Sequence, residues 1–414
     1  MAKREIIIPL DIEDVNIFKV EVSQNGDIHI QLESSLEYGY CRKCGRKITK
    51  LHSYDDWVSV RHLPSFGHAV YVHYQPKRYE CEGCDGGPTT TQQLKWHKEH
   101  SPNTVAFERW LLLSLVNSTV QDVALKVDGT YDTVLGVVER QIDKHVDWGD
   151  YSGLEVLGID EIARLKGHRD FVAVVSARLT DGRVTVLAVL PDRKKETVKA
   201  FLESIPARLK ATIGSVCTDL YEGYCQAVEA VLPHVRRVAD RFHIAKLYRA
   251  AADDLRKAEL KRLKATLSKE QYQTLKGSLW AFRLPPPQLE PDQKLCLNRL
   301  FEYSPRLKQA YDLRQALTAI FDHAPSPRVA DAQLGQWKLQ LWCTQLHCFD
   351  GFLNTLNRFH EEILNYFVAR ESSGFVEGLN NKLKVLTRRS YGLFNISHLF
   401  QRLILDLEGY QRFS

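Results

Sequence analysis

The spacing of apolar and polar positions in the middle of the chain predicts four β-strands and one helix, with the helix between the third and fourth strands. The first three strands are apolar runs, and a turn signal joins the second to the third, as in an antiparallel meander. The first strand ends at Asp160 and Glu161, and the fourth ends at Asp219. The predicted elements, in chain order, are 156–159, 170–177, 183–190, the helix 195–206, and 214–218.

The order β-β-β-α-β, followed by a further helix, is that of an α/β, ribonuclease-H-like sheet, in which the ends of the first and fourth strands are adjacent. Two carboxylates about 5 Å apart repel by roughly 3 kcal/mol at an effective dielectric constant near 20, so Asp160 and Asp219 predict a divalent cation between them. Oxygen ligands favour Mg²⁺ or Mn²⁺ over Zn²⁺. Taken singly, each acid is explained equally well as a turn residue at the end of a strand.

A third acid, Glu377, begins a downstream segment with helical periodicity. At about 100° per residue, Glu377, Lys384 and Arg388 fall within about 60° of one another, and the apolar residues occupy a different side of the helix. Taken alone, Glu377 is better explained as a first-turn acid that interacts favourably with the helix dipole.

The composition is that of an ordinary globular protein, with 414 residues, 44% apolar residues and a net charge of +5. We find neither a secretory signal nor an apolar stretch of about 18 residues, so we expect a cytoplasmic protein with no membrane partner. In a reducing compartment, the nine cysteines favour metal binding or simple burial over disulfide bonds.

Four of these cysteines form two C-x-x-C pairs, Cys41 with Cys44 and Cys81 with Cys84. This spacing lets both sulfur atoms of each pair face one tetrahedral ion, so it predicts a zinc ribbon with one structural Zn²⁺. A nearby histidine, His97 or His100, is an alternative ligand in place of one cysteine. Four buried thiols without a metal are the other interpretation.

Basic residues surround the first pair, which favours a nucleic acid as partner because clustered cations gain from the release of counterions. A solvated basic face is the alternative interpretation. The cations concerned are Arg42, Lys43, Arg46, Lys47 and Lys50.

Three helical segments follow the ribbon, at 107–116, 118–127 and 130–143, and they fit a helix-turn-helix domain. The third segment, together with Lys144 directly after it, carries three acids against two cations, a poor balance for docking in the major groove. From the pattern alone, a DNA-reading domain and a packing domain are equally well supported.

Several segments of the chain resemble the ISL-three insertion-sequence family of DDE transposases. They lie in the family's order behind a C-x-x-C pair and three helices, and the resemblance covers nearly the whole chain. The last is the most specific, because a helix reading V-E-G-x-N-N-K-x-K followed by R-R-x-Y-G is hard to reach by chance. The segments are GIDEIARLKGHRDF, VCTDLYEGY, VADRFHIAKLYRAAADDLRK and GFVEGLNNKLKVLTRRSYGLFN.

This resemblance implies a catalytic triad of Asp160, Asp219 and Glu377 that binds two Mg²⁺ or Mn²⁺ ions, with Asp240 and His243 in support. It also implies a bacterial protein that is associated with the nucleoid when a homodimer or higher oligomer binds double-stranded DNA, both at element ends and at a target. The residues that we expect to contact DNA are Arg42, Lys43, Arg46, Lys166, His168, Lys384, Arg388 and Arg389.

The interval between Asp219 and Glu377 is far too long for one crossover connection, and its sequence is mostly helical. We therefore predict an α-helical insertion within the catalytic domain. The expected domains are an amino-terminal β segment and zinc ribbon at 1–100, a helix-turn-helix at 101–150, a ribonuclease-H-like domain at 151–243 and 371–414, and the insertion at 244–370.

The function expected from these features is that of a transposase that binds the inverted-repeat ends of an insertion sequence. It cleaves phosphodiester bonds there and joins the 3′-hydroxyl ends to target DNA by two-metal-ion catalysis. Two alternatives stay open: a non-catalytic DNA-binding regulator derived from a transposase, and a structure-selective nuclease on the same fold.

Overall fold

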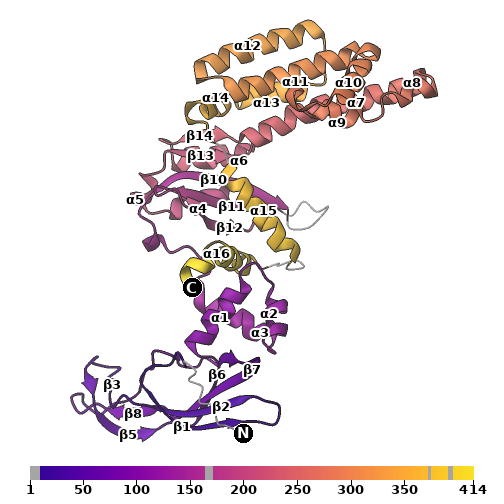
Figure 1. The fold of residues 1–414 in the computed structure, drawn as a ribbon. Coiled ribbons are helices and arrows are strands. Elements are labelled where there is room, and N and C mark those ends of the chain that lie inside the picture. The colour runs from indigo at the N-terminus through magenta and orange to yellow at the C-terminus, as the bar shows by residue number, and fades with distance from the viewer. Residues whose placement is uncertain (1–9, 164–170, 372–373, 390–394) are drawn as a thin grey trace. The chain divides into compact units, whose positions relative to one another are not determined.

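The structure is a computed structural model that describes residues 10–163, 171–371, 374–389 and 395–414. The chain divides into two compact units (Figure 1). Unit 1 comprises Met1–Ile142 and Ile404–Ser414, and unit 2 comprises Asp143–Leu403. Among the described residues, no helix has both the length and the apolar composition needed to cross a membrane.

Unit 1 begins with a four-stranded sheet in the order β1-β2-β7-β6. Alternate residues of β2 and β7, among them Leu32 and Val72, are buried and pack with Trp96. This alternation is expected of a sheet with one face in a core and the other toward solvent. The strands are β1 (Val15–Val22), β2 (Ile28–Ser34), β6 (Val58–Ser65) and β7 (His68–Tyr74).

Shorter strands carry the two cysteine pairs. β3 pairs with β4, and β8 lies between β5 and β9 in a second small sheet. Cys41 follows β3 and Cys81 follows β8, so each pair begins where a strand ends. The strands are β3 (Gly39–Tyr40), β4 (Lys47–Ile48), β5 (Lys50–Tyr54), β8 (Lys77–Glu80) and β9 (Thr89–Thr91).

Three short helices follow at the positions predicted from the sequence. Each begins after a threonine, Thr104, Thr119 or Thr130, whose side chain accepts a hydrogen bond from a backbone N–H of the first turn. The helices contact one another and bury one apolar face each. They are α1 (Val105–Leu115), α2 (Val120–Lys126) and α3 (Tyr131–Gln141).

A buried acid, Glu108, joins α1 to α3. Its side chain is almost fully buried, and it accepts hydrogen bonds from Ser101, Arg140 and Gln141. Arg140 is the one cation of the third helical segment, 130–143, and this internal ion pair engages it. The network therefore favours a packing role for this end of α3.

Unit 2 is built on a five-stranded sheet in the order β12-β11-β10-β13-β14. β10, β11 and β12 form the predicted antiparallel meander, and β13 and β14 run parallel to β10. All four predicted strands are present, and β14 is an additional strand that the sequence pattern did not indicate. The strands are β10 (Leu154–Ala163), β11 (Phe171–Leu179), β12 (Val184–Leu190), β13 (Ser215–Thr218) and β14 (Arg236–Ala239).

The two faces of this sheet belong to different apolar cores. Leu157 and Ile159 of β10 pack in the core that includes α4 (Lys195–Ser204) and α6 (Glu222–Val231). Val156 lies on the other face, in the core that includes α7 and the helices that follow it. Helices therefore cover both faces, as an α/β fold with parallel strands requires.

The helical stretch predicted at 244–370 is present, and α7 leads into it directly from β14 (Figure 1). It has its own apolar core, in which the buried Trp337 donates a hydrogen bond to the carbonyl oxygen of Leu313. Its helices are α7 (Arg241–Thr266), α8 (Lys269–Gln273), α9 (Ser278–Arg283), α10 (Pro291–Tyr303), α11 (Pro305–His323), α12 (Pro327–Thr344), α13 (Asp350–Arg358) and α14 (His360–Ala369). Two more helices, α15 (Gly374–Arg389) and α16 (Ile396–Phe413), follow.

A buried acid, Asp253, fastens α9 to α7. It accepts hydrogen bonds from Arg256 at 2.8 Å and from Arg283 at 2.9 Å. Burial alone would raise the pKa of Asp253, but these two guanidinium groups outweigh it and lower the pKa to about 2 from an ordinary value of 3.8.

We expect Asp253→Asn to lower the free energy of unfolding of unit 2 by about 2 kcal/mol at pH 7. Because the pKa of Asp253 is lower in the folded state, its contribution is complete above the unfolded value of 3.8 and is lost as the pH falls toward about 2. Urea unfolding of wild type and variant at a series of pH values measures this. The exposed Asp254→Asn is the matched control and should change little at any pH.

Candidate active site and zinc centre

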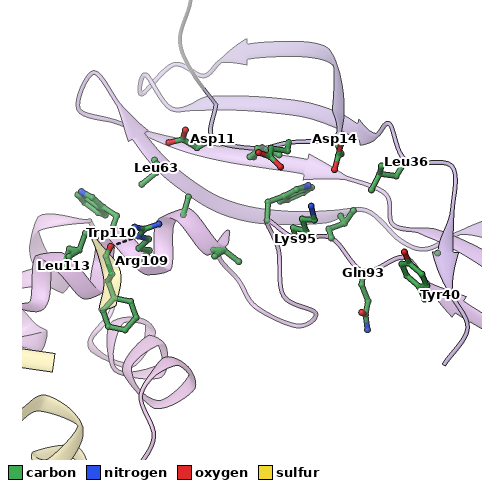
Figure 2. A pocket seen from close by; sticks show the side chains of 18 of the residues that line it. Asp11, Asp14, Leu36, Tyr40, Leu63, Gln93, Lys95, Arg109, Trp110 and Leu113 are labelled. Atoms are coloured by element: carbon green, nitrogen blue, oxygen red, sulfur yellow. Dashed lines mark hydrogen bonds between the residues drawn. The ribbon is translucent and has the colours of Figure 1, made fainter. Parts of the chain in front are cut away.

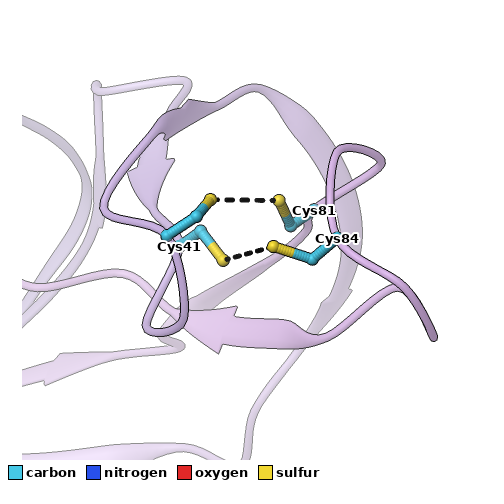
Figure 3. Close-up of side chains that lie close together, drawn as sticks. Cys41, Cys81 and Cys84 are labelled. Atoms are coloured by element: carbon cyan, nitrogen blue, oxygen red, sulfur yellow. Dashed lines mark hydrogen bonds between the residues drawn. The ribbon is translucent and has the colours of Figure 1, made fainter.

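The four cysteines of unit 1 converge on one point (Figure 3). Their sulfur atoms all lie within 4.8 Å of one another, with Sγ separations of 4.0 Å for Cys41–Cys84 and 3.8 Å for Cys44–Cys81. A tetrahedral ion with Zn–S bonds of about 2.3 Å requires sulfur atoms about 3.8 Å apart. The donor set and its spacing therefore fit one Zn²⁺.

The electrostatics of the first pair also suit a metal ligand. The backbone N–H groups of Cys44 and Lys43 lower the pKa of Cys41 to about 6, against an ordinary value of 9.0. A zinc ligand must be a thiolate, and these N–H groups stabilise the thiolate in advance of binding. The hydrogen bond with Cys44 is the main reason that the pKa of Cys84 is raised to about 12. This thiol must therefore lose a proton when it binds a metal ion.

Neither histidine near the ribbon is needed as a zinc ligand. His97 is buried and bonded elsewhere, with Nδ1 2.6 Å from the hydroxyl of Tyr74 and Nε2 2.7 Å from the carbonyl oxygen of Ser101. His100 is exposed and lies outside the four-cysteine cluster. The alternative of a histidine in place of a cysteine is therefore not supported.

The cations beside the first pair differ in how far acids neutralise them. Lys50 lies within 3.1 Å of Glu80 and Glu82, which compensate its charge. Arg42, Lys43 and Arg46 are exposed and form no ion pair with any residue that the structure describes. Among the cations beside this pair, uncompensated positive charge therefore lies on the segment that contains Cys41 and Cys44, which we call the first knuckle.

In unit 2, the parallel pairing of β10 with β13 brings two of the predicted acids together. Ile159 lies opposite Thr218 in this pairing, so the next position on each strand is occupied by Asp160 and Asp219. Alternate residues of a strand share a face, and Asp160 has the parity of Val156. Both acids therefore belong to the face of the sheet that α7 covers, and not to the face covered by α4 and α6.

A third acid continues this row. β13 pairs with β14 through Thr218 and Ala239, and Asp240 follows Ala239 directly. Asp240 is buried, its N–H donates to the carbonyl oxygen of Thr218 at 2.8 Å, and its carboxylate caps α7. Asp219 and Asp240 thus directly follow the carboxyl ends of β13 and β14, which is where α/β sheets place their ligands. Asp160 lies beside them within β10, which continues to Ala163 and so extends past the strand end expected from the sequence.

One of these acids, Asp219, has a raised pKa. Burial and the negative charges of Glu161 and Asp160 raise the pKa of Asp219 to about 7, although His243 acts in the opposite direction. A divalent cation relieves such repulsion, so the residues fit a metal site of the kind predicted from the sequence.

His243 lies in the first turn of α7, beside the row of acids. Its Nδ1 lies 3.3 Å from Asp240 Oδ2. Asp240 raises the pKa of His243 most strongly, Asp160 and Asp219 add to the effect, and burial opposes it. The raised pKa favours a positively charged imidazole at this position.

Glu161, the second acid of the first strand, is engaged by a residue that the sequence reasoning missed. Arg193 donates to Glu161 at 2.9 Å, and its guanidinium group lies 5.0 Å from the ring of Phe171 and 5.1 Å from that of Tyr221. Arg193 follows the end of β12, so its position after a predicted strand was the available signal. The contact between Arg193 and Glu161 depends on the pairing of β10, β11 and β12, which the sequence pattern does not give.

The helix that carries the third predicted acid, α15, packs against β10 (Figure 1). Its apolar residues Leu379, Leu383 and Leu386 are buried, whereas Lys384, Arg388 and Arg389 are exposed, as the periodicity predicted. Glu377 belongs to the first turn of α15, but its side chain lies outside the described residues. Lys166 and His168 also lie outside them.

Among the side chains that the structure describes, only the four cysteines form a cluster of at least three metal-ligating groups within 4.8 Å. The described carboxylates of the row of acids in unit 2 do not meet this condition. The prediction that Asp160, Asp219 and Glu377 form one site therefore stays a prediction.

The cavity of about 1110 Å³ in unit 1 is separate from both sites. Figure 2 shows Asp11 and Asp14 on one side of it and Arg109 and Trp110 on another. Arg109 also donates hydrogen bonds to the backbone oxygen atoms of Phe413 and Ser414. No acid of the strand ends and no cysteine lines this cavity, so its size alone does not mark the active site.

Family models match two parts of the chain. A transposase model, that of the ISL3-type DDE domain, matches residues 157–403. The zinc-finger of transposase IS204/IS1001/IS1096/IS1165 matches residues 37–84. The first match spans more than half of the chain, and it places the protein in the class of DDE transposases. Within that class, the chain belongs to the ISL3 family, and its zinc-ribbon match precedes its DDE-domain match. Membership implies an enzyme that acts on DNA.

Curated relatives have the same extent as this chain. It is 28% identical over 386 residues to the transposase for insertion sequence element IS1001 of Bordetella parapertussis, covering 93% of each chain. It is 24% identical to the transposase for element IS1557 of Mycobacterium tuberculosis, covering 89% of this chain and 86% of the relative. Among solved structures, the Drosophila P element transposase strand transfer complex is similar at 12% identity and a TM-score of 0.37, covering 74% of this chain and 94% of that one.

We expect the purified protein to bind about one zinc ion, and both Cys41→Ser and Cys84→Ser to lose it. Structural zinc contributes on the order of 10 kcal/mol to the folding of small ribbons, so these variants should lose the ribbon while unit 2 stays folded. Metal analysis and limited proteolysis measure the two effects. Cys343→Ser, at an exposed cysteine outside the cluster, is the control. Full zinc content in both ribbon variants would refute the site.

Proposed function

We propose that this protein binds the inverted-repeat ends of an insertion sequence, cleaves phosphodiester bonds there and joins the freed 3′-hydroxyl ends to target DNA. The observation that carries the proposal is the alignment of Asp160 and Asp219 by the parallel pairing of β10 and β13. An antiparallel meander followed by parallel strands, in the order β12-β11-β10-β13-β14, supports a ribonuclease-H-like catalytic domain. Membership of the ISL3 family supports DNA cleavage as the reaction.

Asp160, Asp219 and Glu377 are the carboxylates that we assign to two Mg²⁺ or Mn²⁺ ions. The burial and repulsion that raise the pKa of Asp219 to about 7 support this assignment, because bound cations relieve both. Divalent ions held by these three carboxylates would supply Lewis acidity for an in-line displacement at phosphorus.

Asp240 and His243 are assigned a positioning role beside the triad. Asp240 accepts a hydrogen bond from the backbone N–H of Phe242 at 3.0 Å and so fixes the first turn of α7. This turn holds His243 against the acids, which favour its protonated form. A positive imidazole at this place attracts the DNA phosphate next to the cleaved bond.

We assign recognition of the element ends to the zinc ribbon and to α1–α3, as a helix-turn-helix, with the domain boundaries expected from the sequence. The uncompensated cations of the first knuckle support contacts with the DNA backbone. The exposed basic end of α15, with Lys384 and Arg388, supports contacts near the catalytic site. Binding two element ends requires a homodimer or a higher oligomer.

Asp160→Asn, Asp219→Asn and Glu377→Gln should each abolish Mg²⁺-dependent cleavage and strand transfer, because each preserves shape but removes a charge that metal binding requires. Binding to the ends should persist, because recognition is assigned to other parts of the chain. Gel assays on DNA that carries the inverted repeats flanking the gene measure both steps.

Two acids near the same strand ends provide controls for this experiment. Asp192→Asn changes an acid after β12 that bonds to Thr197 at 2.6 Å, and it should keep cleavage. Glu161→Gln should also keep cleavage, because Glu161 has the parity of the opposite face and pairs with Arg193. An active Asp160→Asn together with an inactive Glu161→Gln would show that the two acids have exchanged roles.

Replacing Lys43 and Arg46 with alanine should weaken binding to all DNA sequences alike, because phosphate contacts position the protein and carry no sequence information. The slope of log affinity against log salt should fall by about 2, one for each lost contact. The matched control replaces Lys19 and Lys50, which lie within 3.1 Å of Glu21 and Glu80, respectively. Equal slopes for the two double variants would remove the first knuckle from the DNA interface.

A further inference from the structure

A stripe of exposed lysines follows α7 away from the row of acids. Lys246, Lys257, Lys261 and Lys264 are all exposed. At about 100° per residue they fall within about 60° of one another around the helix axis, so they line one side of α7. We call these four residues the lysine stripe.

The described acids of α7 pair with only one member of this stripe, Lys257, because Asp253 and Glu259 are engaged mainly by arginines. Asp253 pairs with Arg256 and Arg283. Glu259 binds Arg262 at 2.7 Å and accepts a hydrogen bond from Ser304, also at 2.7 Å.

Asp254 pairs with a member of the stripe, Lys257, at 2.7 Å. Lys246, Lys261 and Lys264 form no ion pair with any residue within the described ranges. Three charges of the stripe are therefore uncompensated, unlike those of a helix face stabilised by its own ion pairs.

The stripe starts at the candidate active site. Asp240 caps α7 and His243 lies in its first turn, so Lys246 stands one turn beyond the residues that face the metal ligands. The helix is 26 residues long and leaves the sheet beside β14 (Figure 1). From Lys246 to Lys264 the stripe spans about 27 Å, the length of about 8 base pairs of duplex.

We propose that the lysine stripe of α7 binds the phosphate backbone of duplex DNA next to the cleaved bond, independently of sequence. The proposal rests on the assignment of DNA cleavage to the row of acids, and it gives the helical insertion a part in that reaction. Lysine suits this contact because it binds phosphates as a mobile point charge and requires no fixed base geometry. Uncompensated cations spaced along such a length gain affinity from the counterions that the DNA releases.

The test replaces Lys246, Lys261 and Lys264 together with glutamine, which keeps the helix and removes three charges. The matched control replaces Lys294, Lys308 and Lys338 of α10, α11 and α12 with glutamine, with the same change of net charge in the same helical region. Thermal melting checks that both variants are folded. Binding to duplexes that contain the element end is then measured between about 50 and 200 mM salt, with footprinting of the protected length.

The stripe variant should bind at least about tenfold more weakly at low salt and show a salt slope smaller by about 2 to 3 than wild type. Its footprint should be shorter by about 8 base pairs on one side of the cleavage position. The control variant should match wild type in both respects. Equal salt slopes and equal footprints for the stripe and control variants would overturn the proposal about the lysine stripe. If the wild-type protein still cleaves the DNA in that case, the proposed function stands. A wild-type protein that neither binds nor cleaves the DNA overturns both.

Discussion

The parallel pairing of β10 with β13 and β14 is the constraint on which the catalytic unit depends. It places Asp160 of β10 beside the positions of Asp219 and Asp240, which directly follow β13 and β14, on one face of the sheet. Backbone hydrogen bonds of the paired strands fix this alignment. Burial and the negative charges of Glu161 and Asp160 raise the pKa of Asp219 to about 7. A divalent cation would favour the ionised form of such a carboxyl group.

The rest of unit 2 is arranged around this edge. The β10–β11–β12 meander gives the sheet its width and brings Arg193 to Glu161, so the acid next to Asp160 is held by a cation on the opposite face. β14 runs directly into α7, whose cap is Asp240. The helical insertion can therefore be large without disturbing the site, because it is joined to the sheet where a helix already begins. Its own core and the Asp253 ion pairs stabilise it locally.

Unit 1 depends on a different interaction. Its ribbon strands are two to five residues long, and its cluster of buried residues there consists of Ile48, Tyr79, Cys41 and Cys81. So small a core cannot offset the entropy of ordering the chain, and the four sulfur atoms that converge on one point supply what is missing. The buried Glu108 network then joins α1 to α3 by hydrogen bonds, so a polar group, rather than apolar area alone, specifies the packing of these helices.

The sequence by itself determined the elements and the chemistry that is local in the chain. Strand and helix periodicities gave four strands of the catalytic sheet, the three short helices and the apolar face of α15, because each depends on neighbouring residues. The C-x-x-C spacing indicated the four cysteines that converge in unit 1 for the same reason. Only the tertiary structure decided which residues from distant segments meet. The pairing of Arg193 with Glu161 and the strand β14 had no local signature, and neither did the use of Arg140 in an internal ion pair, since each depends on a neighbour far away in the sequence. The tertiary structure also showed which lysines of α7 lack a partner, because charge compensation is a property of the folded surface and not of the sequence order.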